Sequence, residues 1–363
     1  MGVAVLINRI EAEPESACTP ADASLGAPFG TYRSDVDVRF EDPLVAKLLA
    51  TRPLKRLAGI GFLGAIDYVR HGSGRSPHLR RHNRLEHSIG VARLADIYAR
   101  GVGLPSHRRH VLLAAALLHD VGHGPMSHTL EPVFRSEFGI DHHLMTRRIL
   151  KGDTRLGSEV PEILGDAGID IDEVLALIDG EHHGDIGFLF SAPINLDTLE
   201  GITRCRAFVA PRPAFHSAET IVRKWAMGRA MPKEAFDAFW RLKHDIYTLL
   251  IGSAHGAALD AIAQAFMRAN RREFSAVDFL LTEPTFKNRY RSIFRCLTLA
   301  SKSMVSLKNE VPASWLSQEI QIKSRSFFVR GDIDLINHAD LDNRYQQKKC
   351  IQGTTLHQLI AQT

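Results

Sequence analysis

The sequence predicts a mainly α-helical protein. Apolar residues recur at three- and four-residue spacing through most of the chain between residues 42 and 270, which is the period of a helix with one buried face. Signals for β-strands are sparse before residue 300. The 363 residues suffice for one large domain or two modest ones, and a content of 45% hydrophobic and 24% charged residues is typical of a globular protein with a sizeable core.

Three regions are expected along the chain. Residues 1–40 are predicted to be an irregular segment, because 11–34 are rich in Ala, Pro, Ser and Gly. Residues 41–300 are predicted to form the helical domain, interrupted at 71–83 by a loop rich in Gly, His and Arg. After residue 300, the stretch IQIKSRSFFVRGDIDLI predicts one or two strands, so 301–363 are expected to form a small mixed α/β C-terminal appendage.

The same helical period places the individual helices of the domain. A first helical stretch starts at Asp42, and another helix begins near Glu86. The following one, HVLLAAALLHDVG, is apolar on most faces as far as His119, which is typical of a helix at the centre of a domain. Further helices are predicted over 141–151, 170–179, 233–250 and 254–270.

Composition narrows the possible functions. The net charge of +4 and the pI of about 8.9 suit anionic ligands such as phosphates without requiring nucleic acid. The four cysteines are far apart and form no CxxC pair, so neither a cysteine zinc site nor a disulfide framework is expected. The N-terminus lacks a signal-peptide pattern, and no stretch approaches the ~18 apolar residues of a membrane span. We therefore expect a cytoplasmic protein with no membrane partner.

Histidines are numerous, 18 in all, and they cluster. The densest cluster is LLHDVGHGPMSH, residues 117–128, which contains His119, Asp120, His123 and His128. At a helix end the chain can bend so that an imidazole and a carboxylate converge on one metal ion, and the following glycines and proline break the helix. The alternative is a helix C-terminus with solvated histidines that interact favourably with the helix dipole. Three histidines and one aspartate within ten residues favour a metal or acid–base site.

Three further segments carry candidate residues. In RLEHSIGV, His87 opens a helix, and Arg84 precedes it by one turn, where it can contact an anion. In INLDTLEGITR, Asp197 lies among apolar residues at the start of a helix. There an unpaired buried carboxylate would be costly, although a helix cap is the simpler local interpretation. In DHHLMTRRIL, His142 is suited to act as an acid or base. The cluster GEHHGD at 180–185 has no matching partner motif.

The order of these residues resembles a known family. His87, then His119-Asp120, then Asp197 resembles the HD-domain metal-dependent phosphohydrolases, which are helical bundles. RLEHSIGV, HDVGHGPMSH, the helix at His142 and LDTLEGITR together look like the branch that contains the deoxynucleoside triphosphate triphosphohydrolases. The resemblance covers roughly residues 40–270.

The resemblance implies a set of roles. The metal ligands would be His87, His119, Asp120 and Asp197, around a divalent ion for which Mn, Fe, Mg, Zn, Co and Ni stay open. His123 and His142 would line the catalytic face. His128 would be near the leaving-group oxygen, and Arg84 near the α-phosphate. In this branch, water attacks the α-phosphorus of a nucleotide substrate and releases nucleoside plus tripolyphosphate. A homo-oligomer and a nucleotide allosteric effector are further expectations from the resemblance.

Two other functions stay open. Thr198 and Gly201 stand where the nucleotidases place a lysine and an aromatic residue, which favours an HD phosphomonoesterase or phosphodiesterase acting on another nucleotide or a short oligonucleotide. A non-catalytic regulator that binds nucleotides or nucleic acid is the third hypothesis, weakly supported by the basic pI and by RYQQKK at 344–349.

Overall fold

The computed structural model describes residues 41–68, 81–206, 217–228, 233–302, 308, 311–317, 319–329 and 345–361. The predicted N-terminal segment and residues 71–80 of the predicted loop lie outside this part of the chain.

The prediction of a mainly α-helical fold is confirmed. The α-helices are α2 (Pro43–Ala50), α3 (Arg52–Leu57), α4 (Arg84–Val102), α5 (Ser106–Leu118), α6 (Glu131–Phe138), α7 (His142–Leu150), α8 (Glu159–Asp166), α9 (Ile171–Ile178), α10 (Phe188–Ser191), α11 (Leu196–Cys205), α12 (Ala218–Ala226), α13 (Lys233–Ile246), α14 (Ala254–Ala269), α15 (Glu283–Arg289), α16 (Arg291–Lys302), α18 (Ala313–Leu316) and α19 (Leu356–Ala361). Short helical turns include η2 (Gly64–Tyr68), η3 (Ser127–Thr129) and η7 (Ala276–Leu280).

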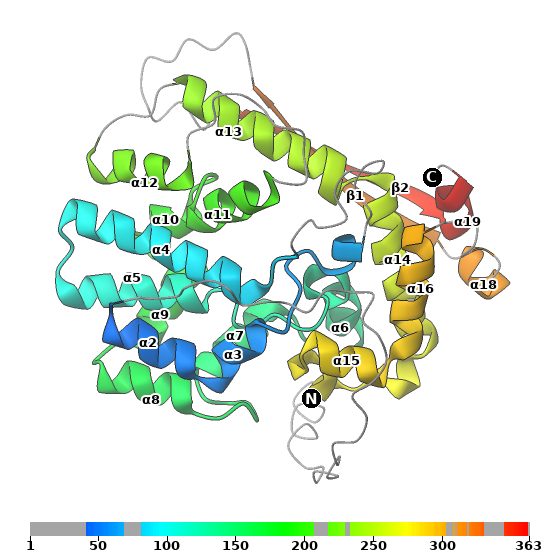
Figure 1. Ribbon diagram of the computed structural model, residues 1–363, viewed down its shortest axis with the longest axis horizontal. Helices are drawn as coiled ribbons and strands as arrows, with labels where there is room; N and C mark the ends of the chain where they lie inside the picture. The colour runs from blue at the N-terminus through cyan, green and yellow to red at the C-terminus, as the bar shows by residue number, and fades with distance from the viewer. Residues whose placement is uncertain are drawn as a thin grey trace.

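Helices α4 and α5 form the centre of one half of the molecule (Figure 1). Residues 111–118 of α5 have no exposed surface, as expected for a helix that is apolar on most faces. α4 begins at Arg84, slightly before the predicted start, because the Asn83 side chain caps it by accepting from the Glu86 backbone N–H at 2.9 Å. This cap places Arg84 and His87 in the first turn, beside the end of α5.

Other helices pack around this pair. α11 and α12 lie along α4, whereas α2 and α9 lie along α5. The other half of the molecule contains α14 and α16, which pack side by side (Figure 1).

α13 was predicted as one helix to residue 250, but its α-helical part ends at Ile246 and a π-helical turn, η5 (Tyr247–Ile251), follows. Such turns often occur at functional sites.

The C-terminal strands form an antiparallel hairpin of β1 (Glu319–Val329) and β2 (Tyr345–Thr355). β1 overlaps the predicted strand stretch and begins one residue before it, at Glu319; residues 330–336 of that stretch lie outside the described part of the chain. β2 was missed, because YQQKKCIQGTT is mostly polar and its residues are largely exposed. β1 packs against α13 and α19 packs against α14, so these elements contact the helical domain.

None of the described helices is both long and apolar enough to cross a membrane alone. One helix pair, Ala235–Ile251 with Ala254–Ala269, passes this test together by length and composition, with a bend of 53° between its members.

Candidate functional site

Four side chains that the sequence analysis assigned to a metal lie together; we call them the metal quartet: His87, His119, Asp120 and Asp197. His87 Nε2 is 3.0 Å from Asp197 Oδ1 and 3.6 Å from Asp120 Oδ2. His119 Nε2 is 3.3 Å from His87 Nε2 and 3.5 Å from Asp120 Oδ1. The quartet joins the first turn of α4, the end of α5 and the first turn of α11, which are far apart in the sequence.

The end of α5 orients His119. The helix stops at Leu118, and His119 is its C-cap residue. His119 Nδ1 lies 2.9 Å from the Ala116 carbonyl oxygen, which can only accept a hydrogen bond, so Nδ1 donates. The proton of a neutral ring is then on Nδ1, and Nε2 presents its lone pair to the quartet.

Glu200 holds His87 from the opposite side. Its Oε2 atom is 2.5 Å from His87 Nδ1, and Arg204 hydrogen-bonds to the same carboxylate. Gly90 makes this contact possible, because a Cβ atom there would lie 2.2 Å from Glu200 Oε1. A carboxylate behind a metal-binding histidine is a common way to fix its ring. The sequence analysis assigned no role to Glu200. Its position four residues before Arg204 on one helix was the only local indication that the two side chains interact.

Buried charged groups shift the pKa values of His87 and Asp120 in the quartet. Burial alone lowers the pKa of His87, but the carboxylates of Glu200, Asp197 and Asp120 outweigh it and raise the pKa to about 9. Burial raises the pKa of Asp120, whereas His119 and Arg84 hold it well below its usual range. Arg84 Nη1 donates to Asp120 Oδ2 at 2.7 Å, and the guanidinium lies over the Phe62 ring.

Asp197 differs from the expectation in one respect. Its side chain is 56% exposed, so the predicted burial among apolar residues is wrong. The helix cap is Asn195, whose side chain accepts from the Thr198 backbone N–H at 2.8 Å. Because Asn195 provides the cap, the Asp197 carboxylate points to His87 and to the open side of the site.

A second cluster lies next to the quartet and comprises His123, His128, His142 and Glu131; we call it the histidine cluster. The rings of His123 and His142 stack at 4.3 Å between centroids, and exposed His128 meets His123 edge-on at 4.6 Å. Glu131 Oε2 is 2.5 Å from His142 Nδ1 and 3.9 Å from His128 Nδ1. The structure thus joins the three histidines singled out in the sequence to Glu131, which was missed although it follows His128 by three residues.

The histidine cluster includes polar atoms with no partner. Both ring nitrogens of buried His123 lack a hydrogen bond among the described residues, although its Nε2 is 3.2 Å from Asp120 Oδ1. Burial and the charge of Arg84 hold the pKa of His123 well below its usual range. Desolvation, Arg84 and His142 also lower the pKa of His128. Buried donors and acceptors of this kind are costly unless a ligand binds them.

The loop after α5 brings the two clusters together. A Cβ atom on Gly122 would lie 2.1 Å from the His142 carbonyl oxygen, so only glycine lets α7 approach this closely. The Gly122 N–H donates to Thr146 Oγ1 at 3.0 Å. Met126 and Ser127 have positive φ values of 59° and 46°, a strained conformation that is frequent at functional sites.

The donor set fits a divalent metal ion. The quartet offers two imidazole nitrogens and two carboxylates, a mixture that suits Mn, Fe, Co, Ni or Zn. Three members of the quartet, His87, His119 and Asp197, lie close enough together to hold an ion, and so do the four residues of the histidine cluster. Asp120 stands beside the first group and pairs with Arg84. The GEHHGD loop forms no such group among the described residues; its Asp185 pairs with Arg108 instead.

Comparison with known families agrees with this geometry. Residues 84–207, which contain the quartet and the histidine cluster, match the HD domain family. This segment is an HD domain. In the chain as a whole, the HD domain is followed by α12–α19 and the hairpin.

Parts of the chain are similar in sequence to several known proteins. The chain is 30% identical to the uncharacterized protein YwfO of Bacillus subtilis over 51% of this chain and 41% of that protein. It is 29% identical to the chicken deoxynucleoside triphosphate triphosphohydrolase SAMHD1 over 40% of this chain and 24% of that protein. Identity to human SAMHD1 is 37% over 25% of this chain and 15% of that protein. The matched segments thus span less than half the length of these relatives.

A solved structure shows a similar fold beyond the HD domain. The crystal structure of a hypothetical protein from Aquifex aeolicus superposes with a TM-score of 0.60 at 17% identity. The superposition covers 89% of this chain and 97% of that one.

Proposed function

We propose that the protein is a divalent-metal-dependent phosphohydrolase that converts deoxynucleoside triphosphates to deoxynucleoside and tripolyphosphate. The observation that carries the proposal is the metal quartet with the histidine cluster directly beside it, inside an HD domain. Similarity to proteins named deoxynucleoside triphosphate triphosphohydrolases supports the choice of substrate.

The ligands of the metal would be His87, His119, Asp120 and Asp197. A divalent ion there supplies Lewis-acid chemistry: it makes water easier to deprotonate and draws negative charge from phosphoryl oxygens. Glu200 and the Ala116 carbonyl keep the two imidazoles turned toward that position. Arg84 is held 2.7 Å from Asp120, at the edge of the quartet, where its charge stabilises an anionic substrate.

The histidine cluster would supply the proton that the leaving group needs. Hydrolysis breaks the bond between the 5′ oxygen and the α-phosphorus, and the 5′ oxygen must gain a proton. His128 is exposed toward solvent, and Glu131 lies 3.9 Å from its Nδ1 atom. The negative charge of an incoming phosphate and of Glu131 favours the protonated imidazole, so His128 can deliver a proton once substrate is present. His123 and His142 provide a polar wall beside it.

A second function is favoured by one observation. Thr198 and Gly201 replace the lysine and aromatic residue of the nucleotidases, and a Cβ atom on Gly201 would lie 3.5 Å from Phe62 and 3.8 Å from His87. These are ordinary van der Waals distances, but Gly201 itself has no side chain, so it offers a substrate no aromatic contact. This favours a phosphomonoesterase or phosphodiesterase of another nucleotide as the alternative. A cytoplasmic location, a homo-oligomer and an allosteric nucleotide remain predictions.

The test is incubation of the purified protein with Mn²⁺ and each of the four deoxynucleoside triphosphates, singly and mixed, with products resolved by chromatography. Nucleoside together with tripolyphosphate is the expected result, and Asp120→Ala protein serves as the inactive control. If metal-loaded protein leaves all four intact but releases phosphate or nucleotide from other esters, the alternative is correct.

A further inference from the structure

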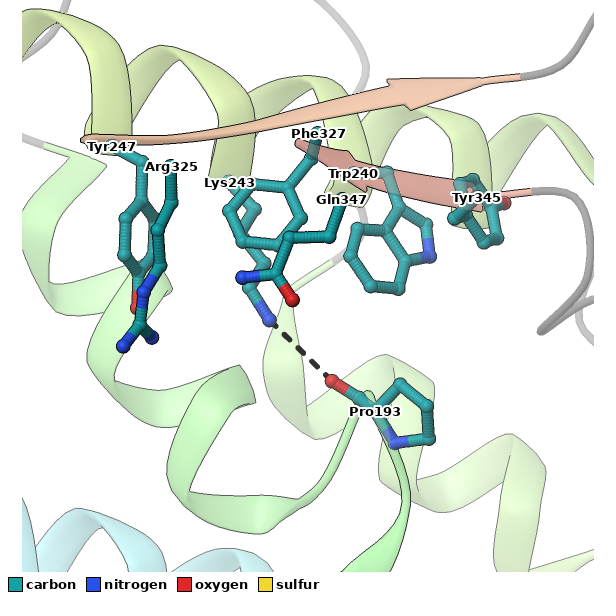
Figure 2. Close-up of a pocket in the computed structure, with 8 residues that line it drawn as sticks. All are labelled: Pro193, Trp240, Lys243, Tyr247, Arg325, Phe327, Tyr345 and Gln347. Carbon is teal, nitrogen blue, oxygen red and sulfur yellow. Dashed lines mark hydrogen bonds between the residues drawn. The ribbon is translucent and has the colours of Figure 1, made fainter. Parts of the chain in front are cut away.

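A pocket of about 280 Å³ lies between α13 and the hairpin, and Pro193, just before α11, completes its lining (Figure 2). α13 and η5 contribute Trp240, Lys243 and Tyr247 to its wall, and the hairpin contributes Arg325, Phe327 and Gln347. None of the described residues that line the pocket is acidic. The C-terminal hairpin therefore builds a cationic and aromatic wall beside the HD domain.

The hairpin concentrates positive charge on the face that lines the pocket. Phe327 pairs with Gln347, and Arg325 pairs with Lys349. Alternate residues of a strand share a face, so Lys349 is on the same face as the three pocket residues. Like charges directly opposite each other destabilise an antiparallel pair, and an anion bound between them removes this cost.

Lys243 adds a buried ammonium group. It is 8% exposed, and it lies 4.9 Å from the centroid of the Trp240 ring and 4.8 Å from that of Phe327. Its Nζ atom donates to the Pro193 carbonyl oxygen at 3.5 Å, and among the described residues it forms no salt bridge with a carboxylate. A buried cation without an anionic partner is unfavourable, so the site is suited to an anionic ligand.

The segment before α11 links the pocket to the quartet, because Pro193 of the pocket precedes Asp197 by four residues. The Asp197 carboxylate acts to raise the pKa of both Lys243 and Tyr247. Tyr247 also hydrogen-bonds with Arg325. In Figure 2, Lys243, Tyr247 and Arg325 extend from α13, η5 and the hairpin toward the side on which Pro193 lies. An anion held here would lie next to a phosphate at the metal position.

We propose that Arg325 of the hairpin, together with Lys243, binds a phosphate group of the substrate that is linked to the phosphate at the metal quartet. The inference rests on the proposed function and deepens it by naming the residues that hold a second, linked phosphate. The planar guanidinium of Arg325 matches two phosphate oxygens at once, whereas Lys243 acts as a point charge. The hairpin is then part of the substrate site.

The experiment is calorimetric titration of the full-length protein, in Mn²⁺, with inorganic tripolyphosphate. Arg325→Gln should weaken binding about tenfold, because it removes a charged hydrogen-bond donor from an exposed site, and Arg325→Lys should fall between it and the wild type. Lys348→Gln is the matched control, because Lys348 pairs with Ser326 on the opposite face of the hairpin. Its affinity for tripolyphosphate should stay within about twofold of the wild-type affinity.

The outcomes separate the subsite from the activity. Equal affinity of Arg325→Gln and wild type, or equal losses in Arg325→Gln and Lys348→Gln, would overturn the proposal. Hydrolysis of phosphate esters by a wild type that binds no tripolyphosphate overturns it as well, but leaves the phosphohydrolase function standing. Binding that depends on Arg325, in a protein that hydrolyses no phosphate ester, supports the anion subsite and rejects the proposed activity.

Discussion

At the scale of single residues, hydrogen-bond partners decide which protons the quartet carries. Both partners of His87, Glu200 at Nδ1 and Asp197 at Nε2, accept hydrogen bonds, so the ring holds two protons when no metal is present. The raised pKa of His87, about 9, has the same origin. A metal ion would take the place of the Nε2 proton, while Glu200 keeps the Nδ1 proton and the ring orientation.

Removing one carboxylate tests the quartet directly. Asp120→Ala should lose most of the bound metal and any activity, because it removes a ligand and leaves Arg84 without its partner. Metal content by elemental analysis and turnover are the measurements. His183→Ala, in the exposed GEHHGD loop, is the control and should change neither. Full metal and full turnover in Asp120→Ala would show that the metal is held elsewhere.

His128 should matter for turnover and not for metal binding. Its ring contacts His123 and His142 and is not part of the quartet. We expect His128→Ala to keep its metal and to slow the reaction by ~10²–10⁴-fold, the usual contribution of a general acid. Single-turnover kinetics with metal-loaded protein measures this. A variant that loses its metal would mean that His128 is a ligand.

The pocket should bind anions less well as the pH rises. Burial lowers the pKa of Lys243 to about 8, with Asp197 opposing this shift and Arg325 adding to it, so the ammonium charge is lost as the pH passes through that value. Lys243→Arg stays charged, since the pKa of a guanidinium is above 12. The wild-type affinity for tripolyphosphate, divided by that of Lys243→Arg, should therefore decrease as the pH rises from about 7 to about 9. A constant ratio would contradict the lowered pKa.

At the scale of elements, close packing of backbones determines where the histidines lie. α7 approaches the loop after α5 so closely that Gly122 meets the backbone of His142 and Thr146. The same kind of contact occurs where Gly90 of α4 makes room for Glu200 of α11. The π-helical turn after α13 carries Tyr247 to the pocket. Small changes at these contacts should therefore displace the candidate site residues.

Gly122→Ala should disturb both stability and the site. The added methyl group clashes with backbone atoms of α7 and is expected to cost about 1–3 kcal/mol of unfolding free energy. Displacement of His142 should also lower the turnover rate. Gly165→Ala, at an exposed position of α8 with no atom within 4 Å, is the control; it should be neutral or slightly stabilising. Denaturant titration compares the two, and equal stabilities would contradict the close packing.

At the scale of the whole molecule, the quartet links segments that are distant in the sequence. A metal ion held by α4, the end of α5 and the first turn of α11 would tie these elements together only in the folded state. The C-terminal hairpin packs against α13, and together they form most of the pocket wall. Ligand binding and folding should therefore be coupled.

Removing the metal should lower the thermal stability of the wild type. At free Mn²⁺ of ~100 times Kd, binding to the folded state contributes about 2.7 kcal/mol. The melting temperature, measured by calorimetry with Mn²⁺ and after chelation, should thus drop on chelation. Asp120→Ala should show a much smaller difference. A drop of the same size in the variant would place the stabilising ion outside the quartet.

The sequence by itself predicted the helical class, the buried α5 and the candidate site residues, namely the metal quartet together with His123, His128 and His142. These features depend on local spacing: a helical period, a helix end and short motifs in a fixed order. Only the tertiary structure decided that Glu200 holds His87, that Glu131 joins the histidines and that Arg325 reaches the site. Each of these contacts joins residues from different elements, so the local spacing of Glu200 and Glu131 does not reveal which ring each one meets. Tertiary packing creates the contacts, because it alone brings distant side chains together.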